Sequence, residues 1–470
     1  MEKKKKKSLD LTQGSIATVL ILFVLPILAG SLIQQLYTTV DAVIVGRFVG
    51  KTGLAAIDSV GTLFKFPINF LSGLSAGATI VVSKLFGEKN DEELDCAIHT
   101  GYTIAIVLGI LCSVVGVLFA PQLLQIMSVP EDIRGITLIY CRIYFAGLWT
   151  MTLYNMVAGI LRAFGDSKSP LYILIACCVI NIAGDIVLVG VFHLGVAGAA
   201  IATIAAQLIS ALLAMRLLSK AHGHDCEEEH CHEEGHDHEH CHRSVWQLIF
   251  CKEHMLQMVS IGIPLAFQGI LFPIANSIVQ ASINTMGTDT IAAWAVCNKL
   301  DLFIWLVADA MSPALSTYVA QNMGAQKHKR VFQGVMLGAF ISFATVGLIS
   351  LALFVAPGPL GSLFVTKTDA GVIIPLVIHY MKMMAPFYVF YAFAEAFSGA
   401  CCGLGDTVKP MIVTLCCTCL LRVIAIFFIL PMFGTMDCIV YIYIASWIAT
   451  GVSFITMFLI KNRKLNKAMA

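Results

Sequence analysis

The sequence predicts an all-α integral membrane protein with twelve transmembrane helices in two parallel six-helix bundles. Mean hydropathy is +0.84 and only 13% of the residues are charged, whereas soluble domains carry about 25% charge. Apolar runs of roughly 20 residues or more, enough to cross a hydrocarbon core about 30 Å thick, recur along the whole chain. Two short segments far apart in the sequence also repeat each other, which indicates an internal duplication.

The apolar runs account for almost all of the 470 residues. They leave no room for a soluble catalytic domain, so we expect the protein not to be an enzyme. The expected spans are 16–46, 54–85, 95–120, 132–162, 170–192, 195–218, 247–285, 290–322, 331–356, 371–402, 411–431 and 437–461.

The repeated segments are Gly-Ile-Leu-Arg-Ala-Phe-Gly-Asp-Ser-Lys-Ser-Pro at 159–170 and Gly-Ala-Cys-Cys-Gly-Leu-Gly-Asp-Thr-Val-Lys-Pro at 399–410. In each, a glycine is expected to end one helix and a proline to start the next. Six spans per half is an even number, so both halves begin on the same side of the membrane and the repeats are parallel. We therefore expect an N-terminal bundle over 1–218, a linker over 219–245 and a C-terminal bundle over 246–470.

Lysine and arginine are distributed unequally between the connections. The N-terminal lysines, the basic C-terminus and most loops on one side carry them, whereas the opposite side has few. Cytoplasmic loops of membrane proteins are enriched in these residues. We therefore expect a multi-pass protein of the bacterial inner membrane with both termini in the cytoplasm.

The linker is strongly polar and contains eight histidines, three cysteines and eight acidic residues between 221 and 242. Such a composition favours binding of Zn²⁺, Ni²⁺ or copper. The alternative is an acidic linker whose metal affinity is incidental, because the spacing defines no unique tetrahedral set. The candidate ligands are His222, His224, Cys226, His230, Cys231, His232, His236, His238, His240, Cys241 and His242.

The chain has sixteen cysteines, and most of them lie inside the expected spans. A cysteine in such a position behaves as a small apolar residue. We therefore expect them to be packing residues.

Ionisable side chains inside a membrane are costly, at roughly 2.5–3.5 kcal/mol on insertion scales, and therefore mark candidate sites. Asp41 lies in the first span, Asn181 and Asp185 lie one helical turn apart in the fifth, and Thr203 lies in the sixth. Their oxygens suit Na⁺ or a shared proton. The alternative is that the two aspartates are separate structural groups near span ends. Neither aspartate has an acidic counterpart in the second half.

Gln34 and Tyr37 share a helix face with Asp41, because their spacing is i, i+3 and i+7. The second half has an acid, Glu395, in an aromatic segment that includes Tyr391. Charge and cation–π attraction there suit an organic cation. The alternative for Glu395 is an ion pair with Lys382 or Arg422.

Asn155 is the residue of the first half that aligns with Glu395. An amide at the position matching a carboxylate supplies a polar group without a charge. We therefore include Asn155 in the expected substrate cavity.

Taken together, Pro26 with Asp41, the two Gly-Asp-x-x-x-Pro segments and Asn181 with Asp185 resemble the multidrug and toxic compound extrusion (MATE) family over all twelve spans. Acids confined to the first bundle are similar to the bacterial and archaeal DinF-like branch. The resemblance implies a cation site at Asp41, Asn181, Asp185 and Thr203, with Tyr37 and Gln34 in the adjoining cavity. The histidine-rich linker has no place in the family pattern.

The resemblance implies a secondary antiporter that exports organic cations or drugs in exchange for Na⁺ or H⁺ by alternating access. The substrates would be small amphipathic or cationic molecules. We expect no required cofactor, no nucleic-acid partner and a monomer in the lipid bilayer. No Gly-x-x-x-x-Gly-Lys-Ser/Thr segment supports ATP drive.

Two alternatives remain open at this point. A lipid-linked oligosaccharide flippase would need a basic cavity to hold pyrophosphate. A transition-metal exporter would use the histidine-rich linker, with histidine or cysteine ligands near Asp185.

Overall fold

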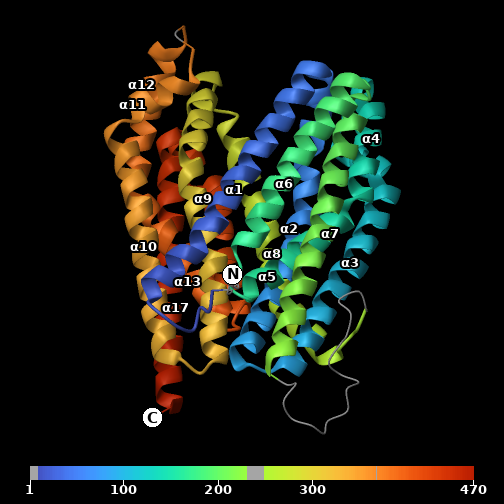
Figure 1. The fold of residues 1–470 in the computed structure, drawn as a ribbon. Coiled ribbons are helices and arrows are strands. Elements are labelled where there is room, and N and C mark those ends of the chain that lie inside the picture. The colour runs from blue at the N-terminus through green and yellow to red at the C-terminus, as the bar shows by residue number, and fades with distance from the viewer. Residues whose placement is uncertain (1–8, 230–247, 367, 470) are drawn as a thin grey trace, which may run out of the picture. The chain divides into compact units, whose positions relative to one another are not determined.

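The computed structural model describes residues 9–229, 248–366 and 368–469. Within these ranges it contains twelve helices that are long and apolar enough to cross a membrane. The predicted number of spans and the all-α fold class are therefore confirmed (Figure 1).

Two compact units make up the chain. Unit 1 comprises Met1–Asp10 and Leu25–Ala266, and unit 2 comprises Leu11–Val24 and Phe267–Ala470. The first expected span is a single helix, α1, and the seventh is α8, and each of these helices begins in one unit and ends in the other. Their bounds are Ile16–Phe48 for α1 and Lys252–Ile283 for α8. The sequence predicts that α1 lies wholly in the bundle over 1–218 and α8 wholly in the bundle over 246–470. These bundle limits remain a prediction.

The other helices of unit 1 include a broken fourth span and a π-helical turn, η1, at the end of the fifth. They are α2 (Lys51–Glu88), α3 (Asp91–Ile126), α4 (Glu131–Ala146), α5 (Leu148–Ala163), α6 (Lys168–Asp185), η1 (Ile186–Val191) and α7 (Gly195–Glu229).

The spans of unit 2 are interrupted in the same way, with two short 3₁₀ turns and a second π-helical turn, η4. They are α9 (Thr288–Gly324), α10 (His328–Val355), α11 (Pro357–Gly361), η2 (Ser362–Phe364), α12 (Ala370–Met384), η3 (Ala385–Phe387), α13 (Tyr388–Gly403), α14 (Val408–Val413), η4 (Thr414–Leu420), α15 (Leu421–Phe428), α16 (Leu430–Phe433) and α17 (Met436–Met469).

Polar contacts explain why a segment before α1 belongs to unit 2. Arg330 of α10 donates to the backbone carbonyls of Gln13 (2.7 Å) and Gly14 (2.8 Å). The Asn322 amide donates to the Leu11 carbonyl at 3.2 Å. These bonds fix residues 11–14 on the end of α9 and the start of α10.

The first part of α8 packs closely on α2 within unit 1. The close approach pairs Gly73 and Gly77 of α2 with Gly262 and Ala266 of α8. A Cβ atom built on Gly77 would lie only 2.6 Å from the Cα of Gly262. Small residues four apart let two membrane helices approach at backbone distance. Glycine therefore decides where α8 attaches to unit 1.

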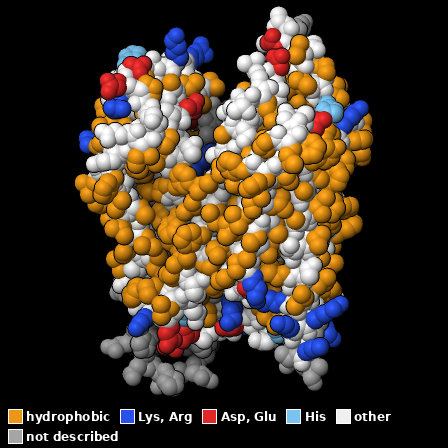
Figure 2. Space-filling model, turned by 180° about the vertical axis from the view of Figure 1, so that it is seen from behind, with side chains coloured by type: hydrophobic (Ala, Val, Ile, Leu, Met, Phe, Trp, Pro, Cys, Tyr) orange, Lys and Arg blue, Asp and Glu red, His pale blue; other side chains and the backbone are white. Residues whose placement is uncertain are grey.

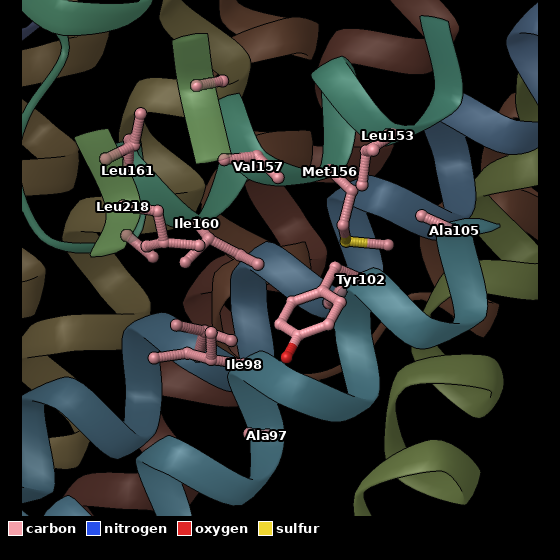
Figure 3. Close-up of a cluster of buried hydrophobic side chains, with 14 of the residues drawn as sticks. Ala97, Ile98, Tyr102, Ala105, Leu153, Met156, Val157, Ile160, Leu161 and Leu218 are labelled. Carbon is pink, nitrogen blue, oxygen red and sulfur yellow. The ribbon is translucent and has the colours of Figure 1, made fainter. Parts of the chain in front are cut away.

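One hydrophobic core of unit 1 is formed largely by α2, α3, α5 and α7. Tyr102 and Ile98 of α3 lie against Met156 and Ile160 of α5, and Leu218 of α7 is fully buried in the same cluster (Figure 3). Burying an aliphatic or aromatic side chain of this size contributes about 1.5–3 kcal/mol in water, but in lipid the gain comes mainly from close packing.

The surface distribution of side chains fits a membrane protein. On the face in Figure 2 hydrophobic side chains cover the middle of the helices, and lysine, arginine and acidic side chains gather near their ends. The same pattern explains the many large hydrophobic side chains that are exposed, such as Leu36, Leu348 and Phe428.

The repeated segments form equivalent turns in the two units. Gly165 and Gly405 have φ angles of +80° and +78°, a backbone conformation that glycine adopts without a Cβ penalty. The next helices, α6 and α14, begin two residues before Pro170 and Pro410. The predicted helix stop and start are therefore confirmed in both repeats.

The acid that follows each glycine has a different role in each unit. Asp166 accepts the backbone N–H groups of Lys168 (3.1 Å) and Ser169 (2.9 Å) and thereby caps α6. Asp406 instead forms ion pairs with Lys409 (2.7 Å) and Lys461 (3.5 Å). Partial burial alone would raise the pKa of Asp406, but the two ammonium groups outweigh it and lower this pKa below its usual value.

A carboxyl group with a lowered pKa stabilises the folded state above its unfolded-state pKa, and this stabilisation is lost as pH falls through the folded-state value. We therefore expect Asp406→Asn to lower the unfolding temperature at pH 7. The usual pKa of an aspartate is about 3.9. The difference in unfolding temperature between the variant and the wild type should therefore shrink as the pH is lowered below about 4. Thermal unfolding in detergent across this pH range measures it. Asp132→Asn, at an exposed position of α4, is the control, and a deficit independent of pH would contradict the ion-pair account.

Helix α7 continues to Glu229, so the helix includes the first residues of the predicted linker. Residues 230–247 lie outside the described residues. The linker ligands predicted at 230–242 therefore stay a prediction, as do the side chains of His222, His224 and Cys226.

Two cysteines depart from the expectation that cysteines only fill space. Cys96 of α3 and Cys251, immediately before α8, form a disulfide with a Cα–Cα distance of 6.3 Å. The expectation was wrong for this pair, because each cysteine lies at the polar start of its expected span, 95–120 or 247–285, and the structure brings these two starts together. Several others, such as Cys177 and Cys401, are free and buried as predicted.

Candidate cation site and substrate cavities

The predicted coupling residues come together where α1, α6 and α7 meet in unit 1. Asp185 is the last residue of α6 and Asn181 lies one turn before it, and both are fully buried. Asp41 of α1 is partly buried and lies within hydrogen-bonding reach of Asp185. Residues far apart in the sequence therefore form one polar site inside an apolar unit.

Asn181 connects the two ends of this site. In the amide orientation that satisfies its neighbours, its nitrogen donates to Asp185 Oδ2 at 3.2 Å and its oxygen accepts from Thr203 at 3.3 Å. The Thr203 hydroxyl also lies 3.0 Å from the Ala199 carbonyl. The amide and the hydroxyl thus hold each other and the Asp185 carboxyl in place.

Each carboxyl group retains one oxygen without a partner. Oδ1 of Asp41 and Oδ1 of Asp185 are both buried and make no hydrogen bond. Two carboxylates this close do not both stay ionised unless a positive charge lies between them. The arrangement therefore suits one proton or one small hard cation coordinated by oxygen.

Tyrosines surround this pair of carboxyls. Tyr37 of α1 is hydrogen-bonded to Thr203 and lies next to Asp41. Tyr140 and Tyr144, one turn apart on α4, also lie close enough to Asp41 to feel its charge. Sequence reasoning missed these two residues, although their i, i+4 spacing places two phenols on one face of α4.

The turn after Asp185 is π-helical over η1. A π-helical turn shifts the register of a helix and is often found at functional sites. The corresponding span of unit 2 has its own π-helical turn, η4. The local break is thus part of the duplicated architecture, whereas the aspartate pair occurs in unit 1 and has no counterpart in unit 2.

The predicted cavity residues of unit 1 do not all line one cavity. Gln34 and Asn155 line a cavity of about 130 Å³, together with Arg162 and Gln207. Tyr37 does not line it and belongs to the cation site instead. The structure therefore separates Tyr37 from the other two.

Unit 2 has a larger cavity of about 330 Å³. Tyr391 lines it, as the sequence led us to expect, and packs edge-on against Trp305 at a ring distance of 4.3 Å. Trp447 lies 6.3 Å from Trp305 on the same wall. Two acids, Asp301 and Asp309, also line the cavity, and Asp301 accepts a hydrogen bond from the Tyr388 hydroxyl.

Glu395 lies beside this cavity rather than in its wall. It is within hydrogen-bonding reach of Tyr391 and Ser312 and close to Asp309. The guanidinium of Arg422 lies instead 3.0 Å from Asn276 Oδ1 and 2.8 Å from Ser446 Oγ. The alternative of an ion pair with Arg422 is therefore not what the structure shows, since Arg422 is committed to neutral partners.

The two units differ in charge at comparable positions. In unit 1 the helix pair α1 and α6 brings together Asp41 and Asp185. In unit 2, α8 and α15 bring together Asn276 and the fully buried Arg422. Unit 2 therefore has no equivalent of the aspartate pair, and its acids Asp301, Asp309 and Glu395 lie in or beside the unit 2 cavity instead.

Among the described residues, no group of three or more histidine, cysteine or acidic side chains is arranged to hold a metal ion. The predicted linker ligands after Glu229 lie outside the described residues, so this finding does not apply to them.

The fold and the buried polar sites define a duplicated membrane transporter with no catalytic constellation in its described part. The sequence profile of the MatE family matches residues 26–187 and 264–428. The chain belongs to this family, the multidrug and toxic compound extrusion transporters, and is a transporter rather than an enzyme. The two matched stretches correspond to the two halves of the duplication.

Curated relatives agree with this assignment. The chain is 27% identical over 400 residues to the probable multidrug resistance protein YoeA of Bacillus subtilis, covering 84% of this chain and 82% of the relative. It is 25% identical over 367 residues to an FAD transporter of Shewanella oneidensis, covering 76% of each. Each match thus extends over at least about three quarters of both chains.

Solved structures share the fold. An outward-facing multidrug resistance MATE transporter of the MOP superfamily matches with a TM-score of 0.86 at 18% identity, over 99% of this chain and 100% of the other. A MOP superfamily transporter from Pyrococcus furiosus, described as having a binding pocket of reversed polarity, matches with a TM-score of 0.84 at 19% identity, over 99% of each chain. At these identities the likeness concerns the fold alone.

Proposed function

We propose that the protein exports organic cations or drugs in exchange for Na⁺ or H⁺ by alternating access. Membership of the MatE family and relatives named as multidrug resistance proteins support the export of drugs. The observation that carries the exchange is the buried pair of Asp41 and Asp185, each with an unpartnered oxygen. Coupling to an ion gradient requires a site that takes up one positive charge, and this pair of carboxyl groups is such a site.

The cycle follows from thermodynamic linkage. An ion that binds one conformation better than another shifts the population toward it. If ion and substrate favour opposite conformations, each lowers the apparent affinity for the other by the same factor. Inward ion flow then drives outward substrate flow without any covalent step.

The unit 2 cavity supports a cationic aromatic substrate. Asp309 supplies negative charge, and Trp305, Tyr391 and Trp447 supply aromatic faces. Cation–π attraction contributes about 2 kcal/mol or more at a desolvated site. The acidic side chains of this cavity, Asp301 and Asp309, would repel the pyrophosphate of a lipid-linked sugar. We therefore set the flippase alternative aside.

The proposal includes location and state. We place the protein in the bacterial inner membrane as a monomer, with both termini on the cytoplasmic side, because basic residues gather in those connections. No cofactor other than the coupling ion is needed. Assignment to the DinF-like branch rests on the aspartate pair, Asp41 and Asp185, having no acidic counterpart in the second half.

The test is efflux of ethidium, a fluorescent organic cation, from cells that express the protein, with Na⁺ and pH varied independently. We expect efflux that collapses when one of the two gradients is removed, and the gradient that matters names the ion. Efflux that persists without either gradient, or no efflux under any condition, would overturn the proposal.

Thr203 offers a graded test of the cation site. Thr203→Val removes the hydroxyl that contacts Asn181 and Tyr37, whereas Thr203→Ser keeps it. A lost hydrogen bond of this kind costs about 1 kcal/mol, or roughly fivefold in affinity. We expect the ion concentration for half-maximal efflux to rise by about that factor in the valine variant. Equal values for serine and valine would remove Thr203 from the site.

A further inference from the structure

The Cys96–Cys251 disulfide has no part in the proposed transport cycle. Cys96 lies in the first turns of α3, and Cys251 directly precedes α8. Both are partly exposed. Under the topology proposed above, both helix ends face the cytoplasm, where disulfides in most organisms are transient and regulatory rather than structural.

Other contacts hold the two cysteines side by side. The backbone N–H of Cys251 donates to the Thr100 hydroxyl at 3.0 Å, and the Thr103 hydroxyl donates to the Ile249 carbonyl at 3.2 Å. Thr100 and Thr103 follow Cys96 on the same face of α3. The cysteines would therefore stay close when the disulfide is reduced, and reclosing would need little rearrangement.

A second polar pair lies one helical turn away. His254 of α8 is almost completely buried, and its Nε2 lies 2.5 Å from Glu93 Oε2 of α3. Glu93 precedes Cys96 by three residues and His254 follows Cys251 by three, so the two pairs are adjacent.

We propose that Cys96 and Cys251 are a reversible cytoplasmic redox site whose oxidation fastens the start of α8 to α3 and slows transport. The oxidant is a small disulfide such as oxidised glutathione. One cysteine thiolate attacks it and releases the first glutathione thiolate. The second cysteine then displaces the other glutathione. The protein pair loses two electrons, and its two thiol protons end on the two glutathione thiols.

The expected effect on transport rests on the proposed function. Helix α8 contributes to unit 1 up to Ala266 and to unit 2 from Phe267. Alternating access requires such a shared helix to adjust as the transporter changes conformation. A covalent bond at its unit 1 end restricts this adjustment, whereas the free dithiol leaves it available.

The disulfide can be detected directly because the linker lies between the two cysteines in sequence. A full-length variant would carry a specific protease site within 230–247, with serine at the linker positions Cys226, Cys231 and Cys241. The protein is treated with oxidised glutathione, its remaining thiols are blocked, and the linker is cleaved. Because the disulfide joins the two fragments, a non-reducing gel should then show one band near 50.8 kDa, the mass of the chain. Reduction should separate two fragments.

Three variants make this test specific. Cys96→Ser and Cys251→Ser should each give two fragments even after oxidation. Cys416→Ser, at an exposed free cysteine, should still give the single band. Two fragments from the parent protein after oxidation would overturn the redox site.

Sidedness and transport are measured in membrane vesicles. Oxidised glutathione added outside should close the disulfide in inverted vesicles, whose cytoplasmic face is outward, and not in right-side-out ones. Ethidium uptake by inverted vesicles should then fall at least about fivefold, the lower end of typical allosteric coupling, and recover with dithiothreitol. Closure only from the opposite face, or unchanged uptake after closure, would overturn the regulatory site.

Two further results are informative. If reduced vesicles transport no ethidium at all, the proposed function fails, while the gel still decides whether the redox site exists. If zinc blocks alkylation of both cysteines but oxidised glutathione never joins the fragments, the cysteines are metal ligands and the redox proposal is overturned.

Discussion

Asp41→Asn is expected to abolish ion-coupled efflux while the protein still folds. The amide has nearly the same size as the carboxyl, but it cannot supply the negative charge that holds a proton or Na⁺ beside Asp185. Hydrogen bonds to charged groups contribute about 1.5–3 kcal/mol, so the ion affinity should fall roughly tenfold to a hundredfold. Ethidium efflux from cells under an imposed gradient measures the loss.

A control separates coupling from folding. Glu88→Gln changes an acid at the end of α2 whose partner is Lys84 on the surface, and it should leave efflux unchanged. Both variants should elute from size exclusion as the wild type does. Efflux at the wild-type rate in Asp41→Asn would remove Asp41 from the coupling site.

Gly77→Ala is expected to destabilise the protein strongly, although alanine is normally a favourable helix residue. Its Cβ would lie 2.6 Å from the backbone N and Cα of Gly262, which leaves no flexible atom to move aside. Overpacking of this kind costs about 1–3 kcal/mol. The unfolding temperature in detergent should therefore fall, and the yield of folded protein with it.

The matched substitution is Gly61→Ala on the same helix. No atom lies within 4 Å of a Cβ built at Gly61, so this change removes a glycine without creating a contact. We expect its unfolding temperature to equal or exceed that of the wild type. An equal effect of the two substitutions would mean that the close approach of α2 and α8 does not limit stability.

The fold could be predicted because a membrane-spanning helix leaves a recognisable local pattern in the sequence. Each span must satisfy its own backbone hydrogen bonds as a helix and cover them with apolar side chains, so hydropathy alone finds the spans. The glycines at 165 and 405 need a left-handed backbone conformation at the same place in each repeat, which made the duplication visible. The sequence also singled out Asp41 and Asp185, because acids are costly inside apolar runs, and the structure places these two side by side; their role as a cation site stays a prediction.

The features that could not be predicted depend on contacts between distant helices. Tyr140 and Tyr144 approach Asp41 from α4, and tyrosine alone carries no signal in a membrane span. Sequence alone left an ion pair of Glu395 with Arg422 open as an alternative, but packing places Arg422 beside Asn276. The Cys96–Cys251 disulfide joins residues 155 positions apart, and spacing alone cannot reveal such a pair.

The central claim is that an ion bound at Asp41 and Asp185 and a bound substrate lower each other's affinity, and ion release on substrate binding tests it most directly. Purified protein in weakly buffered detergent solution, loaded with Na⁺ or adjusted to a pH at which the site is occupied, is titrated with ethidium. The account predicts release of H⁺ or Na⁺ as ethidium binds, and no release from Asp41→Asn. Ethidium binding to the wild type with release of neither ion would contradict it.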